Sequence, residues 1–348
     1  MSRAASLLES ADPPGLGARN AARPTLPASI VASAIIALIA AAAFLAGWMP
    51  IGFSIATVFL FAGPHNWMEA RYFLSQMPAR WGPLRAFFTT GIIGVLLLTI
   101  GFAALPYLGR AGRWTDAHWD VASATWNSLM LIWITLLVGL RSRQHPRRDW
   151  AWVTPVACLL VAGVWLWPQP WELAMVYLHP LVALWFLDRT IARRKPGWLI
   201  AYRKSLLLIP LALVMLWTRL ADAPALAGQD MLTLRITQHA GAGLFEHVSP
   251  HLLVSTHTFL EMLHYGVWIV AVPLIAMRGS PLNLSAIPLV RRSNACRGLI
   301  VTLLAVGMAV VVGLWASFVS DYAMTRDLYF TVAIAHVLME IPFLLRTL

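Results

Sequence analysis

Long apolar segments alternate with short polar connections along most of this chain. Ten segments have the length and apolar character of membrane-spanning helices: 27–47, 50–73, 84–106, 121–140, 150–167, 171–188, 199–217, 250–276, 297–319 and 327–346. About 20 residues of helix cross the hydrocarbon core of a bilayer. The pattern therefore predicts an all-α fold, a polytopic transmembrane helical bundle with about ten spans.

Composition and the N-terminal segment refine this picture. The 348 residues are 59% hydrophobic and 12% charged, which is about half the charged fraction of soluble domains. Residues 1–26 are polar, rich in Ala, Pro and Arg, and lack the pattern of a cleavable signal peptide. We expect a disordered cytoplasmic tail over 1–26, followed by one transmembrane helical domain over 27–348.

The net charge of +11 follows the orientation of the spans. With the N-terminus in the cytoplasm, all but five of the 26 Lys and Arg residues fall on the cytoplasmic side. This distribution is the positive-inside pattern, and an even number of spans also places the C-terminus in the cytoplasm. We therefore expect a multi-pass protein of the cell inner membrane whose basic residues meet anionic lipids. A nucleic-acid partner is not needed to explain the charge.

The connections carry further signals. Most of the 17 tryptophans lie near the ends of the expected spans, where indole rings anchor helices at the membrane interface. The longest external connection, about 218–249, is expected to contain an amphipathic helix at the membrane surface. Ser249-Pro250 predicts the start of the eighth span.

Histidine and glutamate recur at helical spacing inside the apolar segments. The spacing His-x-x-x-Glu occurs at His65 and Glu69, at His257 and Glu261, and at His336 and Glu340. His264 lies on the same helix face as His257, and His179 lies in the sixth span. Ionisable groups at membrane depth are rare and face a bundle interior or a cavity. We expect the five imidazoles to face one interior region.

Neutral imidazoles near carboxylates suit a transition metal, and Fe²⁺ above all where oxygen chemistry is involved. The predicted metal ligands are His65, His179, His257, His264 and His336. Glu261, Glu340 and Glu69 are the candidate catalytic acids, which would bind the metal or fix the tautomers of the ligand rings.

Structural roles are the alternative for each residue. His65 follows Gly63-Pro64 and can cap a kinked helix, and the other histidines can form hydrogen bonds between helices. Glu69 can pair with Arg71, and Asp188 beside Arg189 is interpreted as a solvated helix end. The remaining histidines are interpreted as surface residues: His118, His145, His239, His247 and His251.

The stretch GPHNWME, which contains His65 and Glu69, resembles the Pro-His-Gly-x-x-Asp element of the Brp/Blh family of membrane β-carotene cleavage dioxygenases. The resemblance implies a many-spanning helical protein whose histidines hold a non-haem iron, with His65 as the Pro-His ligand. The sequence departs from the family at Asn66, which replaces Gly, and at Glu69, which replaces Asp. The late histidine pair of the family is one turn apart, whereas His257 and His264 are two turns apart.

Three classes of function follow from these residues. The first is a non-haem iron oxygenase acting on an apolar small molecule, such as a carotenoid, another isoprenoid or a lipid. The second is a haem- or quinone-linked electron-transfer protein, since two histidines on facing helices can ligate haem. The third is a proton-coupled transporter with a His/Glu relay. The histidine boxes of fatty-acid desaturases, His-x-x-x-His and His-x-x-His-His, are absent from the expected cytoplasmic edges of the spans, which argues against an ordinary fatty-acid desaturase.

Overall fold

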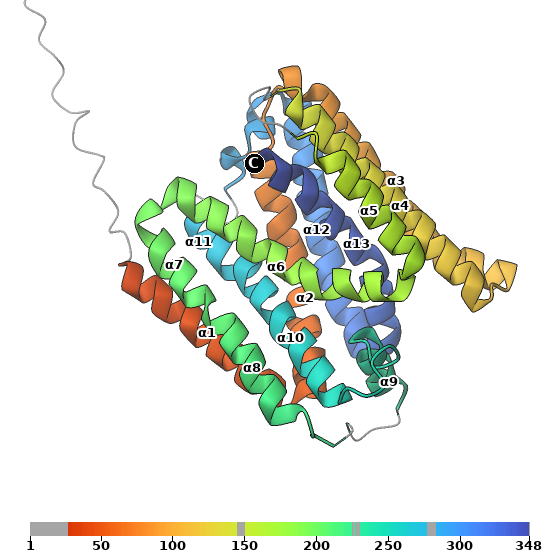
Figure 1. Ribbon diagram of the computed structural model, residues 1–348. Helices are drawn as coiled ribbons and strands as arrows, with labels where there is room; N and C mark the ends of the chain where they lie inside the picture. Colours follow the sequence, from red (N-terminus) through yellow and green to blue (C-terminus); the bar gives the residue numbers. More distant parts are fainter. Residues whose placement is uncertain (1–26, 145–149, 225, 227–229, 277–282, 348) are drawn as a thin grey trace, which may run out of the picture.

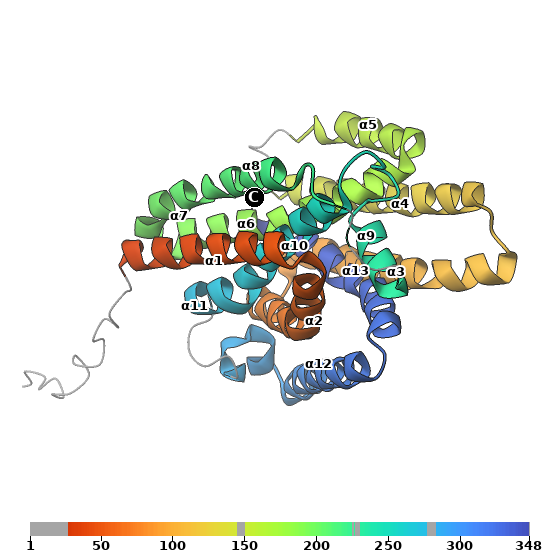
Figure 2. The same cartoon turned by 90° about the horizontal axis from the view of Figure 1, so that it is seen from below.

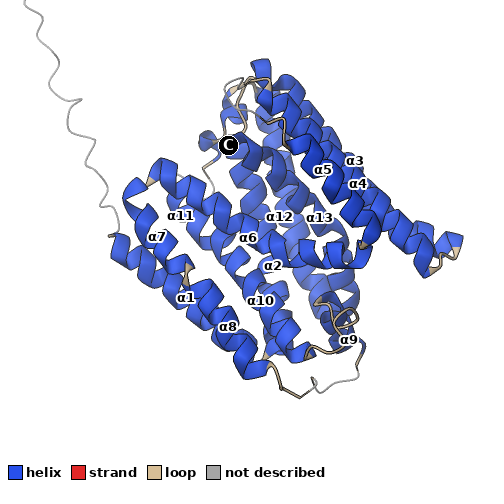
Figure 3. Cartoon of the chain, viewed as in Figure 1, coloured by secondary structure: helices blue, strands red, loops and turns tan. Residues whose placement is uncertain are grey.

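The computed structural model describes residues 27–144, 150–224, 226, 230–276 and 283–347, and these residues contain helices but no strands (Figure 3). The tail expected at 1–26 lies outside the described residues. In chain order the α-helices are α1 (Ala28–Trp48), α2 (Pro50–Gln76), α3 (Arg85–Gly112), α4 (Asp116–Ser142), α5 (Val153–Leu166), α6 (Pro168–Arg194), α7 (Leu199–Leu206), α8 (Leu208–Leu220), α9 (Met231–His239), α10 (Pro250–Gly266), α11 (Val272–Ala276), α12 (Asn294–Ser320) and α13 (Tyr322–Thr347). A π-helix, η3 (Val267–Ala271), joins α10 to α11.

The all-helical, membrane-type fold expected from the sequence is confirmed. Eight helical stretches of the described chain are long and apolar enough to cross a membrane: Ala28–Trp48, Gly82–Gly112, Asp116–Ser142, Pro168–Arg194, Pro196–Leu220, Pro250–Ala276, Asn294–Ser320 and Tyr322–Thr347. The other two expected spans are also helical, but α5 has 14 residues and α2 carries His65, Glu69 and Arg71 in its second half. These polar residues lower the mean hydropathy of α2.

The helices run alternately up and down the bundle (Figure 1). The start of α1 and the end of α13 lie toward the same side, while α9 and the start of α10 lie toward the opposite side. Helix α10 packs against α1, α2, α6, α8 and α9 and is the most buried of the candidate spans. It therefore forms the centre of the bundle, which Figure 2 shows from below.

Small residues allow α1 to approach α10 closely. Ala42, Ala43 and Ala46 of α1 are buried against Phe259 and neighbouring apolar side chains of α10. Ser255 of α10 donates a hydrogen bond to the Ala46 carbonyl oxygen at 2.8 Å. Small side chains and hydrogen bonds of this kind drive helix association in lipid, where the hydrophobic effect between helices is weak.

Tryptophans join α3 to α4. The indole nitrogens of Trp126 and Trp133 donate to the carbonyl oxygens of Leu98 and Thr90, at 2.8 and 3.0 Å. At Gly94 a Cβ atom would overlap the Trp133 ring, so glycine is required for this close approach. These two tryptophans lie inside the bundle and are not interfacial anchors.

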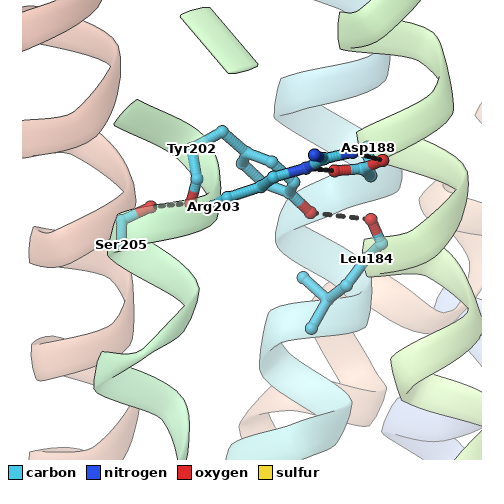
Figure 4. Close-up of polar contacts among 5 residues, drawn as sticks. All are labelled: Leu184, Asp188, Tyr202, Arg203 and Ser205. Carbon is cyan, nitrogen blue, oxygen red and sulfur yellow. Dashed lines mark hydrogen bonds and ion pairs between the residues drawn. The ribbon is translucent and has the colours of Figure 1, made fainter. Parts of the chain in front are cut away.

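Helices α6 and α7 are joined by a polar contact (Figure 4). The Arg203 guanidinium binds both carboxylate oxygens of Asp188, at 2.8 and 3.0 Å. The buried Tyr202 donates its hydroxyl to the Leu184 carbonyl oxygen at 2.7 Å. Asp188, expected to be a solvated helix end, therefore has a defined partner on the next helix, which the sequence did not indicate.

Candidate metal centre

Four histidines from four helices meet in the interior of the bundle. They are His65 on α2, His179 on α6, His264 on α10 and His336 on α13. The ring centroids lie 4.6 Å apart for His179 and His264, 5.0 Å for His65 and His336, 5.2 Å for His179 and His336 and 5.4 Å for His65 and His264. The Nε2 atoms of His179 and His336 are 3.2 Å apart.

Two buried glutamates complete this cluster. In one group, His65, Glu69, His264 and His336 offer donor atoms that all lie within 4.8 Å of one another. In a second group, His179, His264 and Glu340 do so within the same distance. The two groups share His264. Because the donors are imidazole nitrogens and carboxylate oxygens, the cluster has the chemistry of a transition-metal site.

The tautomer of His65 is fixed by its own helix. The His65 Nδ1 atom lies 3.0 Å from the Phe61 carbonyl oxygen, one turn earlier on α2. A carbonyl oxygen only accepts hydrogen bonds, so Nδ1 carries the proton. The Nε2 lone pair of His65 is thus available, and this atom is fully buried within the cluster.

Glu340 lies beside a second ring. Its Oε2 atom lies 3.5 Å from His179 Nδ1 without a hydrogen bond, and its Oε1 atom accepts a hydrogen bond of 3.0 Å from the Trp268 indole. A proton on Nδ1 of His179 would face the carboxylate and leave Nε2 free to bind a metal. Carboxylates that hold ligand imidazoles in this way are a recurring feature of metal sites.

Several buried atoms of the cluster have no hydrogen-bond partner among the described residues. They are His65 Nε2, His336 Nδ1, both ring nitrogens of His264, both carboxylate oxygens of Glu69 and Glu340 Oε2. An unsatisfied buried polar atom costs about 1–3 kcal/mol, and more when it is charged. Native proteins avoid several such atoms at one place unless an ion or water satisfies them. The donors present therefore fit a bound metal ion.

Each of the four helices carries a proline or a π-helical turn near the cluster. Pro64 precedes His65, Pro180 follows His179, and Pro342 lies two residues after Glu340, each inside its helix. The π-helix η3 begins three residues after His264. Proline removes a helical hydrogen bond, and π-helical turns occur frequently at functional sites.

His257 and Glu261 lie outside both groups. His257 precedes His264 by seven residues, which separates them by about 10.5 Å along the axis of α10. We expected all five histidines to face one interior region. In the structure, His257 does not join the other four. The His257 ring instead contacts His239 and Tyr177, with centroids 5.1 and 5.8 Å apart. Glu261 accepts a hydrogen bond of 2.8 Å from the Tyr265 hydroxyl.

Several residues around the cluster were not expected there from the sequence. His239, interpreted as a surface histidine, packs against His257 and Phe330 and lines a cavity in the bundle. Trp268, which donates a hydrogen bond to Glu340, was not among the candidate residues. Neither was Tyr265, whose ring centroid lies 4.4 Å from that of His65. A tryptophan in the middle of a span, away from the membrane interface, was the available signal for Trp268.

A cavity of about 660 Å³ reaches the cluster. The four clustered histidines line it, together with residues near the N-terminal ends of α4 and α6, among them Asp120 and Glu172. Phe102, Trp126, Met175 and Ile334 contribute apolar walls. Its volume lies within the range of about 300–1,000 Å³ that is typical of small-molecule sites.

Comparison with known proteins found no matching family model, no matching curated protein and no matching solved structure. The function is therefore argued from the cluster and the cavity.

Proposed function

We propose that this protein is a membrane-embedded non-haem iron oxygenase that acts on a lipid-soluble substrate. The observation that carries the proposal is the convergence of four imidazoles from four helices, with ring centroids 4.6–5.9 Å apart in five of the six pairs. Of these, His65 Nε2 and both nitrogens of His264 have no other partner among the described residues. His65, His179, His264 and His336 would bind the ion, Glu69 is the candidate carboxylate ligand, and Glu340 would hold His179 in its metal-binding tautomer.

Charge balance supports a single divalent ion. Glu69 and Glu340 are both buried, each with a relative exposure of 1%, and two carboxylates carry two negative charges. A buried charge is strongly unfavourable unless it is paired or bound to a metal. Four neutral imidazoles add no charge, so one divalent ion makes the whole cluster neutral.

The arrangement favours a bare ion over haem. A haem iron offers two axial positions, on opposite faces of a wide porphyrin. Here four rings come from four helices. Their centroids are at most 5.9 Å apart in each of five pairs. A porphyrin plane between any two of them would displace the others. The proton-relay alternative uses the same side chains without a metal, and metal analysis separates the two.

The cavity supports an apolar small-molecule substrate. Its walls are mostly apolar and lead directly to the histidines. When bound, the iron supplies oxygen activation, and cleavage of one carbon–carbon double bond by O₂ yields two carbonyl groups without a further reductant. The protein groups orient the substrate and exclude water. Glu69, Glu261 and Glu340 are the acids that would manage protons in or beside the site, and the similarity of GPHNWME to the Brp/Blh element is consistent with this class.

We also propose that all ten helical passes lie in the inner membrane with both termini in the cytoplasm. The positive-inside distribution of Lys and Arg supports this orientation. It agrees with the alternating direction of the helices and with the start of α1 and the end of α13 toward one side of the bundle (Figure 1). The short α5 and the polar α2 would then cross the membrane packed against neighbouring helices.

The proposal is tested by elemental analysis of protein purified from iron-replete cells. About one iron per chain is expected in the wild type and almost none in His264→Ala, because His264 belongs to both donor groups. His257→Ala is a matched control on the same helix and should keep its iron. Wild-type protein without stoichiometric metal would remove the oxygenase proposal and favour the relay.

A further inference from the structure

The cavity has a second polar region away from the metal centre. His239 on α9 and His257 on α10 both line it, with ring centroids 5.1 Å apart and nearly perpendicular planes at 84°. The His257 ring also contacts the Tyr177 ring, with centroids 5.8 Å apart. This pair is separate from the clustered histidines, since His257 and His264 are about 10.5 Å apart along α10.

Neighbouring side chains hold the pair in place. The Tyr177 hydroxyl lies 2.9 Å from the Ala240 carbonyl oxygen and 3.1 Å from that of Leu253, so α6 fixes the end of α9 against α10. The centroids of the Phe330 and His239 rings lie 4.6 Å apart, and the Arg326 guanidinium lies over the Phe330 ring, 4.6 Å from its centroid. Rings held in this way form a preorganised binding site at low entropic cost.

The chemistry of the pair selects an uncharged oxygen. Burial lowers the pKa of the His239 imidazole well below its ordinary value, and His257 and Arg326 lower it further. A neutral imidazole has one donor and one acceptor, which suits a hydroxyl or carbonyl group. Three acids line the same cavity, Asp120, Glu172 and Glu261, and its lining residues include no Lys or Arg. The charged side chains that line the cavity are therefore all acidic, which disfavours an anionic ligand there.

We infer that the cavity binds a lipid-soluble molecule that carries a hydroxyl or carbonyl oxygen, which His239 and His257 bind while the apolar part reaches the metal centre. The inference rests on the proposed function for what happens at that centre. It adds the substrate class and the distance between the bound oxygen and the metal centre. This distance is about two helical turns, roughly 10 Å. The reacting carbon is then set by its distance from the oxygen group.

Three isoprenoids with one carbon skeleton test this inference: farnesene, farnesol and farnesoic acid. Each is equilibrated by dialysis between nanodiscs that contain the full-length protein and empty nanodiscs of the same lipid, which corrects for partition into the bilayer. Farnesol should bind about tenfold more tightly than farnesene. Farnesene lacks the hydroxyl group and would leave the polar side chains of the site without a hydrogen-bonding partner. Farnesoic acid should bind more weakly than farnesol.

Variants assign the preference to the histidine pair. His257→Leu should abolish the preference for farnesol, while His257→Gln, which keeps a donor and an acceptor, should retain most of it. His251→Ala, on the same helix but outside the cavity lining, should behave as the wild type. Equal binding of farnesol and farnesene by the wild type would overturn the inference, and so would an unchanged preference in His257→Leu or tightest binding of farnesoic acid.

Metal content measured on the same samples separates this inference from the proposed function. A preference for farnesol in protein without iron would remove the oxygenase but leave the oxygen-binding pair in place. Stoichiometric iron without any preference would do the reverse.

Discussion

The Nε2 atoms of His179 and His336 lie 3.2 Å apart in the interior of the bundle. Two imidazoles bound to one ion at about 2.1 Å place their nitrogens about 3.0–3.4 Å apart in octahedral or tetrahedral geometry. The observed separation thus already matches adjacent ligands. Little movement of α6 against α13 would accompany metal binding.

Metal removal should lower the stability of the protein without unfolding it. An ion that binds only the folded state adds about 2.7 kcal/mol when its concentration is 100 times its dissociation constant. We expect a strong chelator to lower Tm, and added Fe²⁺ to restore it, in thermal unfolding of the detergent-solubilised protein. An unchanged Tm after complete loss of metal would contradict this expectation. His264→Ala should have a Tm that no longer responds to the metal.

Trp268 should act on the metal through Glu340. Trp268→Phe removes the indole N–H that donates to Glu340 Oε1, and Glu340→Gln removes the carboxylate that faces His179. Each change should weaken metal affinity by about 10–100-fold, measured by competition with a chelator of known affinity. Trp133→Phe is a matched control, because its indole also donates inside the bundle, to the Thr90 carbonyl oxygen, away from the cluster. It should lower stability and leave the metal affinity unchanged.

Tyr202 should matter more for stability than the ion pair beside it (Figure 4). Tyr202→Phe removes the hydrogen bond to the Leu184 carbonyl oxygen in a buried place and should cost about 0.5–1.5 kcal/mol. Asp188→Asn should cost less than about 1 kcal/mol, because the Arg203 side chain is 56% exposed and solvent screens the pair. Equilibrium unfolding in mixed micelles compares the two. A larger effect of Asp188→Asn would contradict this ranking.

The N-cap of α9 should give that helix a pH dependence. The Asp230 carboxylate accepts hydrogen bonds from the backbone N–H of Thr233 at 2.9 Å and of Leu232 at 3.0 Å, and from the Thr233 hydroxyl. These bonds, the one from the Thr233 backbone first, lower the pKa of Asp230 below its ordinary value. The stabilisation is therefore fully present above about pH 4 and is lost as the pH falls through the lowered pKa.

Hydrogen exchange of the α9 amides, corrected for intrinsic rates, measures this loss. Protection should decrease below about pH 4 in the wild type. Asp230→Asn keeps a capping oxygen that does not titrate in this range, so its α9 protection should not follow the same pH profile. Equal profiles for both proteins would show that Asp230 is not the responsible group.

Reporter fusions test the proposed orientation. A fusion after Arg143 should report the cytoplasmic side, and a fusion after Asp222 should report the opposite side. The reason is the accumulation of Lys and Arg on one side of the ten expected spans. The same side for both fusions would contradict the topology.

The sequence by itself determined the class of fold and most of the candidate ligands. Apolar runs of about 20 residues leave the backbone only helical structure in a membrane, so the helices begin and end close to the expected residues. Because ionisable side chains are rare at membrane depth, His65, His179, His264 and His336 were identifiable without any structure. Helix periodicity could place His257 and His264 on one face of α10, but it could not indicate how far along the axis the other helices meet that face.

Only the tertiary structure decided which of these residues meet. The packing of α2, α6 and α13 around α10 brings their histidines to His264 and leaves His257 about two turns away, beside His239 of α9. It also gives Glu340 the Trp268 indole, across 72 residues of sequence. Such contacts depend on the depth and rotation of each helix, which helix packing sets and which local sequence patterns do not encode.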